Sequence, residues 1–103
     1  MQANTYLVAL SGIKRPSFEL IPKSQLLFTA YVNEEGFHCI SDDDLRLEVF
    51  SRDELNLHYE LDRQIAFLWR EFVMCPADNL EPVALALRHK LQSMFTAFKG
   101  QNG

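Results

Sequence analysis

The fold is decided by residues 51–74, which read SRDELNLHYELDRQIAFLWREFVM. Apolar residues recur there at steps of four, four, three and four, at Leu57, Leu61, Ile65, Leu68 and Phe72. This spacing places them on one face of an α-helix. A second set of apolar residues widens that face, at Leu55, Tyr59, Ala66, Trp69 and Val73. We therefore expect a helix that is covered on two sides, by a sheet and by a further helix or a second subunit.

Both ends of this helix carry signals in the sequence. Ser51 and Glu54 have the spacing of a capping box, in which each side chain accepts a backbone N–H. Pro76 cannot continue a helix, so we expect the helix to end near Met74.

The residues before the helix favour strands. Five segments are rich in strand-forming residues or alternate between apolar and polar ones: residues 5–10, 17–21, 26–32, 37–40 and 45–49. Between two of them, Asn33–Gly36 reads as a tight turn, with Gly36 where a positive φ is often required. The pattern predicts an antiparallel sheet of about four to five short strands.

A second amphipathic helix is predicted at Pro82–Phe98, because proline suits a first helical turn. Its apolar face would carry Ala84, Leu87, Leu91, Met94 or Phe95, and Phe98. Gly100 would then stop this helix. The expected fold is a single α+β domain over residues 1–103, with the sheet packed against two C-terminal helices.

The composition is that of a folded, soluble protein. Of the 103 residues, 48% are hydrophobic and 12% aromatic, a content that disordered chains lack. No apolar run reaches the roughly 18–20 residues that a membrane span needs, and the first residues lack the regions of a signal peptide. We therefore expect an intracellular, cytoplasmic protein in which Cys39 and Cys75 are reduced thiols.

The charges are unevenly distributed along the chain. The net charge is −4, yet residues 34–81 hold 13 of the 14 acidic residues and only four arginines. An acidic centre disfavours binding to phosphates, and the six bases of the flanks are too sparse for a nucleic-acid site. Charge steering favours a protein partner instead, including a second copy of the chain in a homodimer.

The acidic triplet Asp42–Asp44 has two interpretations. Carboxylates beside a strand could hold Mg²⁺ in a small metal-dependent hydrolase or nuclease. Neighbouring strand residues point to opposite faces, however, so we favour a solvated turn with Asp side chains capping the backbone. Glu54, His58 and Asp62 also line one helix surface and could hold a metal, but we interpret them as the helix side that faces water. No motif implies a cofactor.

Other residues are candidates for an interface. Trp69 is either an anchor for a partner or a core residue between the two helices, and we favour the core. Arg88, His89 and Lys90 form a basic patch that either meets an acidic partner or is simply solvated.

Cys75 lies past a helix end, where the helix dipole opposes a thiolate, so a structural thiol is expected.

One segment has the order of a known family. The segment starts with a strand at Phe28–Val32, the turn Asn33–Gly36 and a returning strand. It continues with Asp44–Leu45, a short third strand and a helix that ends in Leu-Trp-Arg-Glu-Phe. From Leu27 to Phe72 this pattern resembles the N-terminal domain of HicB-type antitoxins and their stand-alone relatives. The resemblance implies a three-strand-plus-helix unit and a toxin partner. The family's C-terminal DNA-binding segment has no counterpart here.

The preferred hypothesis is a non-catalytic protein-binding module of antitoxin-like or regulatory type, with a homodimer as one form. The first alternative is the metal-dependent hydrolase or nuclease that would use Asp42–Asp44. The second alternative is an accessory protein of a phage or mobile element that binds a host factor. The interface candidates are Trp69, Arg88, His89 and Asp42, Asp43 and Asp44.

Overall fold

The computed structural model describes residues 4–100. Four strands form the larger antiparallel sheet: β1 (Asn4–Leu10), β4 (Leu26–Val32), β5 (His38–Asp42) and β6 (Leu47–Ser51). Their order is β1-β4-β5-β6, so β1 and β6 are its edges. Since this sheet precedes both helices in an α+β arrangement, the predicted fold class is confirmed.

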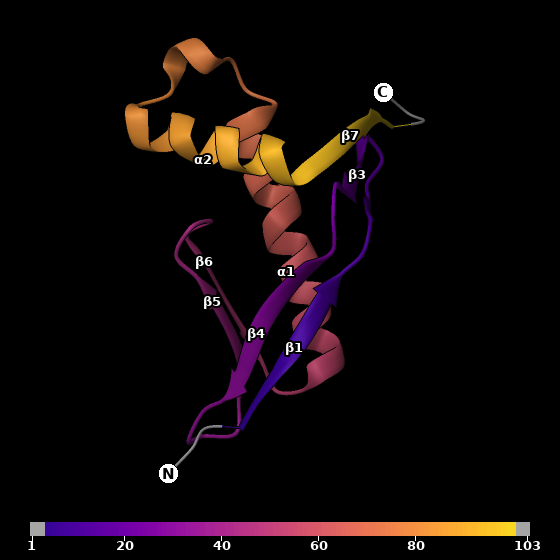
Figure 1. The fold of residues 1–103 in the computed structure, drawn as a ribbon, viewed down its shortest axis with the longest axis vertical. Coiled ribbons are helices and arrows are strands. Elements are labelled where there is room, and N and C mark those ends of the chain that lie inside the picture. Colours follow the sequence, from indigo (N-terminus) through magenta and orange to yellow (C-terminus); the bar gives the residue numbers. More distant parts are fainter. Residues whose placement is uncertain (1–3, 101–103) are drawn as a thin grey trace.

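A second, smaller antiparallel sheet lies beyond the β1–β4 pair, where β3 and β7 run side by side (Figure 1). It contains β2 (Ile13–Lys14), β3 (Phe18–Pro22) and β7 (Phe95–Lys99), with β3 in the centre. The chain enters it from β1 and returns from it to β4, whose first residue, Leu26, pairs with Leu10. The strand predicted at residues 17–21 therefore exists but belongs to this sheet.

Helix α1 (Glu54–Leu68) continues without a break into a π-helical segment, Trp69–Val73. A 3-10 turn, Ala77–Asn79, then leads to helix α2 (Pro82–Met94), which crosses the C-terminal end of α1 (Figure 1). Neither helix among the described residues is long and apolar enough to cross a membrane.

The core lies between α1 and one face of the larger sheet, called here the inner face. Leu57, Leu61 and Ile65 of α1 are fully buried, as is Ile40 of β5. Burial of one such side chain contributes about 1.5–3 kcal/mol of transfer free energy. The periodicity of residues 57–72 therefore identified the buried side of the helix correctly.

The predicted helix start at Ser51 is wrong. Ser51 pairs with His38 as the last residue of β6, and its buried Oγ accepts a hydrogen bond from Asn56 Nδ2 (2.7 Å). Asp53 caps the helix instead, because its extended backbone lets a carboxylate oxygen accept the Asn56 N–H (2.7 Å).

The second helix ends earlier than predicted, at Met94. Phe95 has an extended backbone (φ −129°, ψ 146°) and begins β7, so residues 95–99 pair with β3. Phe95 is buried whereas Phe98 is 52% exposed, so Phe98 does not extend the apolar face of α2. Aromatic residues and threonine favour strands, and the edge that β3 offers decides between two locally acceptable structures.

Gly100 is consequently not a helix stop. Its N–H donates to the Ser17 carbonyl (3.1 Å), and a Cβ at this position would collide with the Pro16 carbonyl oxygen.

The turn predicted at Asn33–Gly36 is confirmed. Gly36 has a φ of 86°, and Asn33 Oδ1 accepts the N–H of Phe37 (2.9 Å).

Candidate functional site

The acidic triplet starts at Asp42, the last residue of β5, and continues into the hairpin turn of residues 43–46 that leads to β6. Asp42 Oδ1 accepts the Leu45 N–H (3.1 Å), and Arg46 completes the turn with a φ of 52°. This is the capped turn that we favoured from the sequence. Among residues 4–100, no three His, Cys, Asp or Glu side chains converge in a way that could hold a metal ion.

The basic patch of α2 is divided between three environments. Lys90 lies 3.8 Å from Asp44, which links α2 to the acidic turn. His89 is exposed. Arg88 is half-buried, and its Nη1 donates to the carbonyls of Phe72 (3.1 Å), Val73 (2.9 Å) and Cys75 (2.9 Å).

Arg88 therefore terminates the π-helical segment. Its guanidinium supplies a positive charge and hydrogen bonds to carbonyl groups that have no partner within the helix. The sequence offered no signal for this contact, because Arg88 is separated from Phe72 by 16 residues.

Trp69 lies in the core, at 5% exposure. Its ring meets Phe95 edge-to-face, with centroids 6.3 Å apart and an interplanar angle of 84°. The core position that we favoured for Trp69 is thus the one that the structure shows.

The polar row on α1 is partly buried rather than uniformly solvated. Glu54 is exposed, but the Asp62 side chain is only 27% exposed, and its Oδ1 has no hydrogen-bond partner among the described residues. Burial raises the pKa of the Asp62 carboxyl, while His58 and Arg15 lower it. His58 Nε2 lies 3.9 Å from Asp62 Oδ1.

Both cysteines are free thiols in the structure. Cys75 Sγ donates to the Glu71 carbonyl (3.0 Å) at the end of the π-helical segment, which agrees with a structural role. Cys39 is buried, but it points to the outer face of the larger sheet, opposite α1.

The outer face of the larger sheet carries more apolar surface than the sequence reasoning anticipated. Side chains alternate along each strand, so the residues between the core positions share this face. One row crosses all four strands, since Thr5 pairs with Tyr31, Tyr31 with Cys39, and Cys39 with Phe50. Leu7 is 63% exposed, Leu27 49% and Phe50 65%.

An aromatic corner borders this face. Phe37 meets Phe50 edge-to-face, with centroids 6.0 Å apart, and the Arg52 guanidinium lies 5.1 Å above the Phe37 ring. A cavity of about 350 Å³ opens beside it, lined partly by Tyr31 and Cys39. The nearby Cys39 sulfur raises the pKa of Tyr31, so the phenol stays protonated at neutral pH.

The sequence did contain a signal for the outer face. Leu7, Leu27 and Phe50 stand between inward-facing residues, at positions where an amphipathic strand ordinarily places polar side chains. On β6 the other outward position holds a charged residue, Glu48. The surface is therefore suited to contact with apolar groups rather than to acid–base chemistry.

Comparisons with known proteins do not add a relative. No protein-family model matches the chain, and no curated protein or solved structure matches it significantly.

Proposed function

We propose that this protein is a non-catalytic protein-binding module that pairs with a second copy of itself through the outer face of its larger sheet. The observation that carries the proposal is the exposure of Leu7, Leu27 and Phe50 on one uncovered sheet face. These residues are spread over the face from the edge strand β1 to the edge strand β6, and large exposed apolar surface of this kind is typical of interaction sites.

Charge favours a second copy as the occupant. A two-fold interface brings the same patch of both subunits together, so any charge near its centre would face its own like. The central outward positions of β1 and β4 are Leu7, Ala9, Leu27 and Thr29, all uncharged. Two such sheets can stack about 10 Å apart with their side chains interdigitated.

An antitoxin-type role is the more specific part of the proposal, and it is supported by the sequence resemblance over Leu27–Phe72. That role would use the dimer as a platform for a toxin-like protein partner. A pull-down from the native cell, followed by identification of the retained proteins, addresses it.

Site-directed crosslinking tests the dimer. In a Cys39→Ala, Cys75→Ser background, which removes both native thiols, Thr29→Cys places a thiol on the outer face, and Ser24→Cys places one in the exposed turn between β3 and β4 as a control. We expect a short bismaleimide to crosslink Thr29→Cys into dimers and to leave Ser24→Cys monomeric. Equal crosslinking of the two variants, or of neither, would contradict the proposal.

A further inference from the structure

A second surface lies on α1 and on the π-helical segment that continues it, on the side that faces away from the sheet. Exposed residues recur there at helical spacing: Leu55 (84% exposed), Tyr59 (59%), Arg63, Phe67 (46%), Arg70 and Met74 (51%). The sequence predicted that a further helix or a second subunit would cover Leu55 and Tyr59, and α2 packs on the π-helical segment instead and leaves both exposed.

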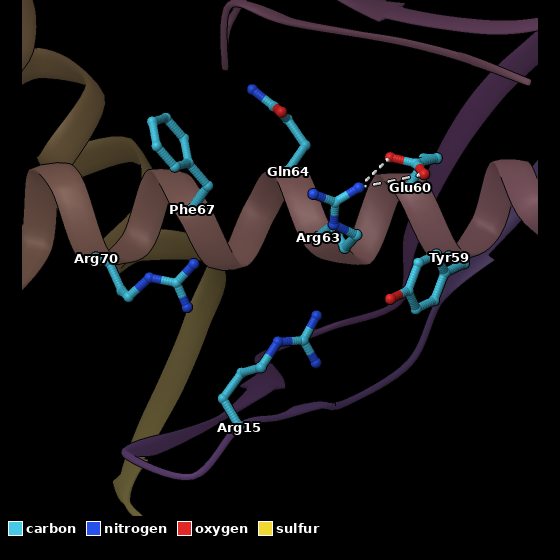
Figure 2. A pocket seen from close by; sticks show the side chains of 7 residues that line it. All are labelled: Arg15, Tyr59, Glu60, Arg63, Gln64, Phe67 and Arg70. Carbon is cyan, nitrogen blue, oxygen red and sulfur yellow. Dashed lines mark hydrogen bonds and ion pairs between the residues drawn. The ribbon is translucent and has the colours of Figure 1, made fainter.

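Part of this surface is hollowed into a groove of about 420 Å³ (Figure 2). Three guanidinium groups line it, from Arg63 and Arg70 on the helix and from Arg15 on the loop between β2 and β3. Figure 2 shows Arg15 reaching up from that loop towards the helix and Arg70 reaching down from the helix towards the loop. Tyr59 and Phe67 line the same groove.

The groove is electropositive in an otherwise acidic part of the chain. Among residues 4–100, one carboxylate lines the groove, that of Glu60, and it accepts from Arg63 Nη1 at 3.1 and 3.3 Å. Arg15 Nη1 donates to the Lys14 carbonyl, and the Arg15 charge also reaches the carboxyl of Asp62. Within the described part of the chain, no carboxylate forms an ion pair with Arg70, and all three guanidinium groups have further N–H donors to offer a ligand.

We propose that this groove binds an acidic peptide segment of a partner protein, with carboxylates on Arg15, Arg63 and Arg70 and apolar side chains against Tyr59 and Phe67. Arginine combined with aromatic residues is the composition of protein interfaces, and guanidinium groups pair with carboxylates in bidentate fashion. A nucleic acid fits less well, because the protein carries a net charge of −4. This inference stands apart from the proposed dimer, which uses the other side of the sheet.

Selection from a random library of short displayed peptides tests the proposal. The immobilised full-length protein should enrich peptides that combine Asp or Glu with aromatic or aliphatic residues. Binding of labelled copies of these peptides is then measured by fluorescence anisotropy at physiological ionic strength. Their affinity for Arg63→Glu and for Arg70→Glu should be lower than for wild type by about tenfold or more. Arg63→Gln should weaken binding less, because it removes attraction without adding repulsion.

The controls separate this site from the rest of the surface. Lys23→Glu makes the same charge change at an exposed position outside the groove and should leave affinity within about twofold. Leu7→Lys, on the outer sheet face, should also leave it unchanged. The proposal is overturned by a selection without acidic enrichment, by equal losses in Lys23→Glu, or by tighter binding of a labelled DNA oligonucleotide.

Discussion

The two faces of the larger sheet are made by the same strands but differ in burial. Ala30 and Ile40 on the inner face are fully buried under α1, whereas Leu7, Leu27 and Phe50 on the outer face are about half exposed or more. A sheet with one solvated face ordinarily carries polar residues there. The outer face thus exposes more apolar surface than a solvated sheet face ordinarily does, and no segment among residues 4–100 covers Leu7, Leu27 or Phe50.

This contrast separates the residues that stabilise the fold from those that we propose for the interface. The inner face is accounted for by α1, with Arg88 and α2 holding the far end of that helix. The outer face has no role in folding that the single chain reveals. Its apolar residues are better explained by an interface than by stability.

The largest effect is expected where α1 covers the inner face. Leu61→Ala removes a fully buried side chain and should lower the free energy of unfolding by about 2–5 kcal/mol. Leu55→Ala is the same change on the open side of the same helix, at 84% exposure, and should stay within about 0.5 kcal/mol. Urea denaturation measures both, and equal losses would mean that the helix faces are wrongly assigned.

A smaller effect is expected at the end of the covering helix. Arg88→Ala leaves the carbonyls of Phe72, Val73 and Cys75 without their donor and should cost about 1–3 kcal/mol. His89→Ala, at the adjacent exposed position, should be nearly neutral. Thermal unfolding followed by circular dichroism compares them, and an unchanged melting temperature in Arg88→Ala would remove the capping role.

The smallest effect on stability is expected at Asp62. Because burial raises the pKa of its carboxyl in the folded state, ionising it opposes folding. The stability present below pH 3.8, where the carboxyl is neutral in both states, is lost as the pH rises through the raised folded pKa. At pH 7, Asp62→Asn should therefore be slightly more stable than wild type.

The pH dependence gives this prediction its control. The advantage of Asp62→Asn should shrink as the pH falls towards 3.8, and Asp78→Asn, the same change at an exposed position, should stay within about 0.5 kcal/mol of wild type at pH 7. A loss of stability in Asp62→Asn at pH 7 would show that its ionised carboxylate is favourably paired.

The sequence predicted the elements with strong local signals and missed those that depend on distant pairing. Helical spacing at Leu57, Leu61 and Ile65 identified the buried side of α1, and Gly36 marked its turn correctly. The strand at Phe95–Lys99 was missed because its partner, β3, lies about 75 residues away in sequence, and helix periodicity continues into it.

The candidate site was predictable only in part for the same reason. The capped turn at Asp42–Asp44 could be identified because its residues are neighbours in the sequence. The outer sheet face and the arginine groove assemble side chains from separate elements, such as Arg15 with Arg70. Local patterns cannot show which of these elements meet, or which face α2 leaves uncovered.

Sedimentation equilibrium of wild type and Leu7→Lys tests the central claim most directly. Leu7→Lys places a charge in the middle of the outer face, at a 63% exposed position where folding should tolerate it. The proposed dimer predicts a wild-type mass approaching twice that of one chain as concentration rises, and a monomeric Leu7→Lys with an unchanged circular dichroism spectrum. A wild-type monomer at every concentration, or a Leu7→Lys dimer of undiminished affinity, would contradict it.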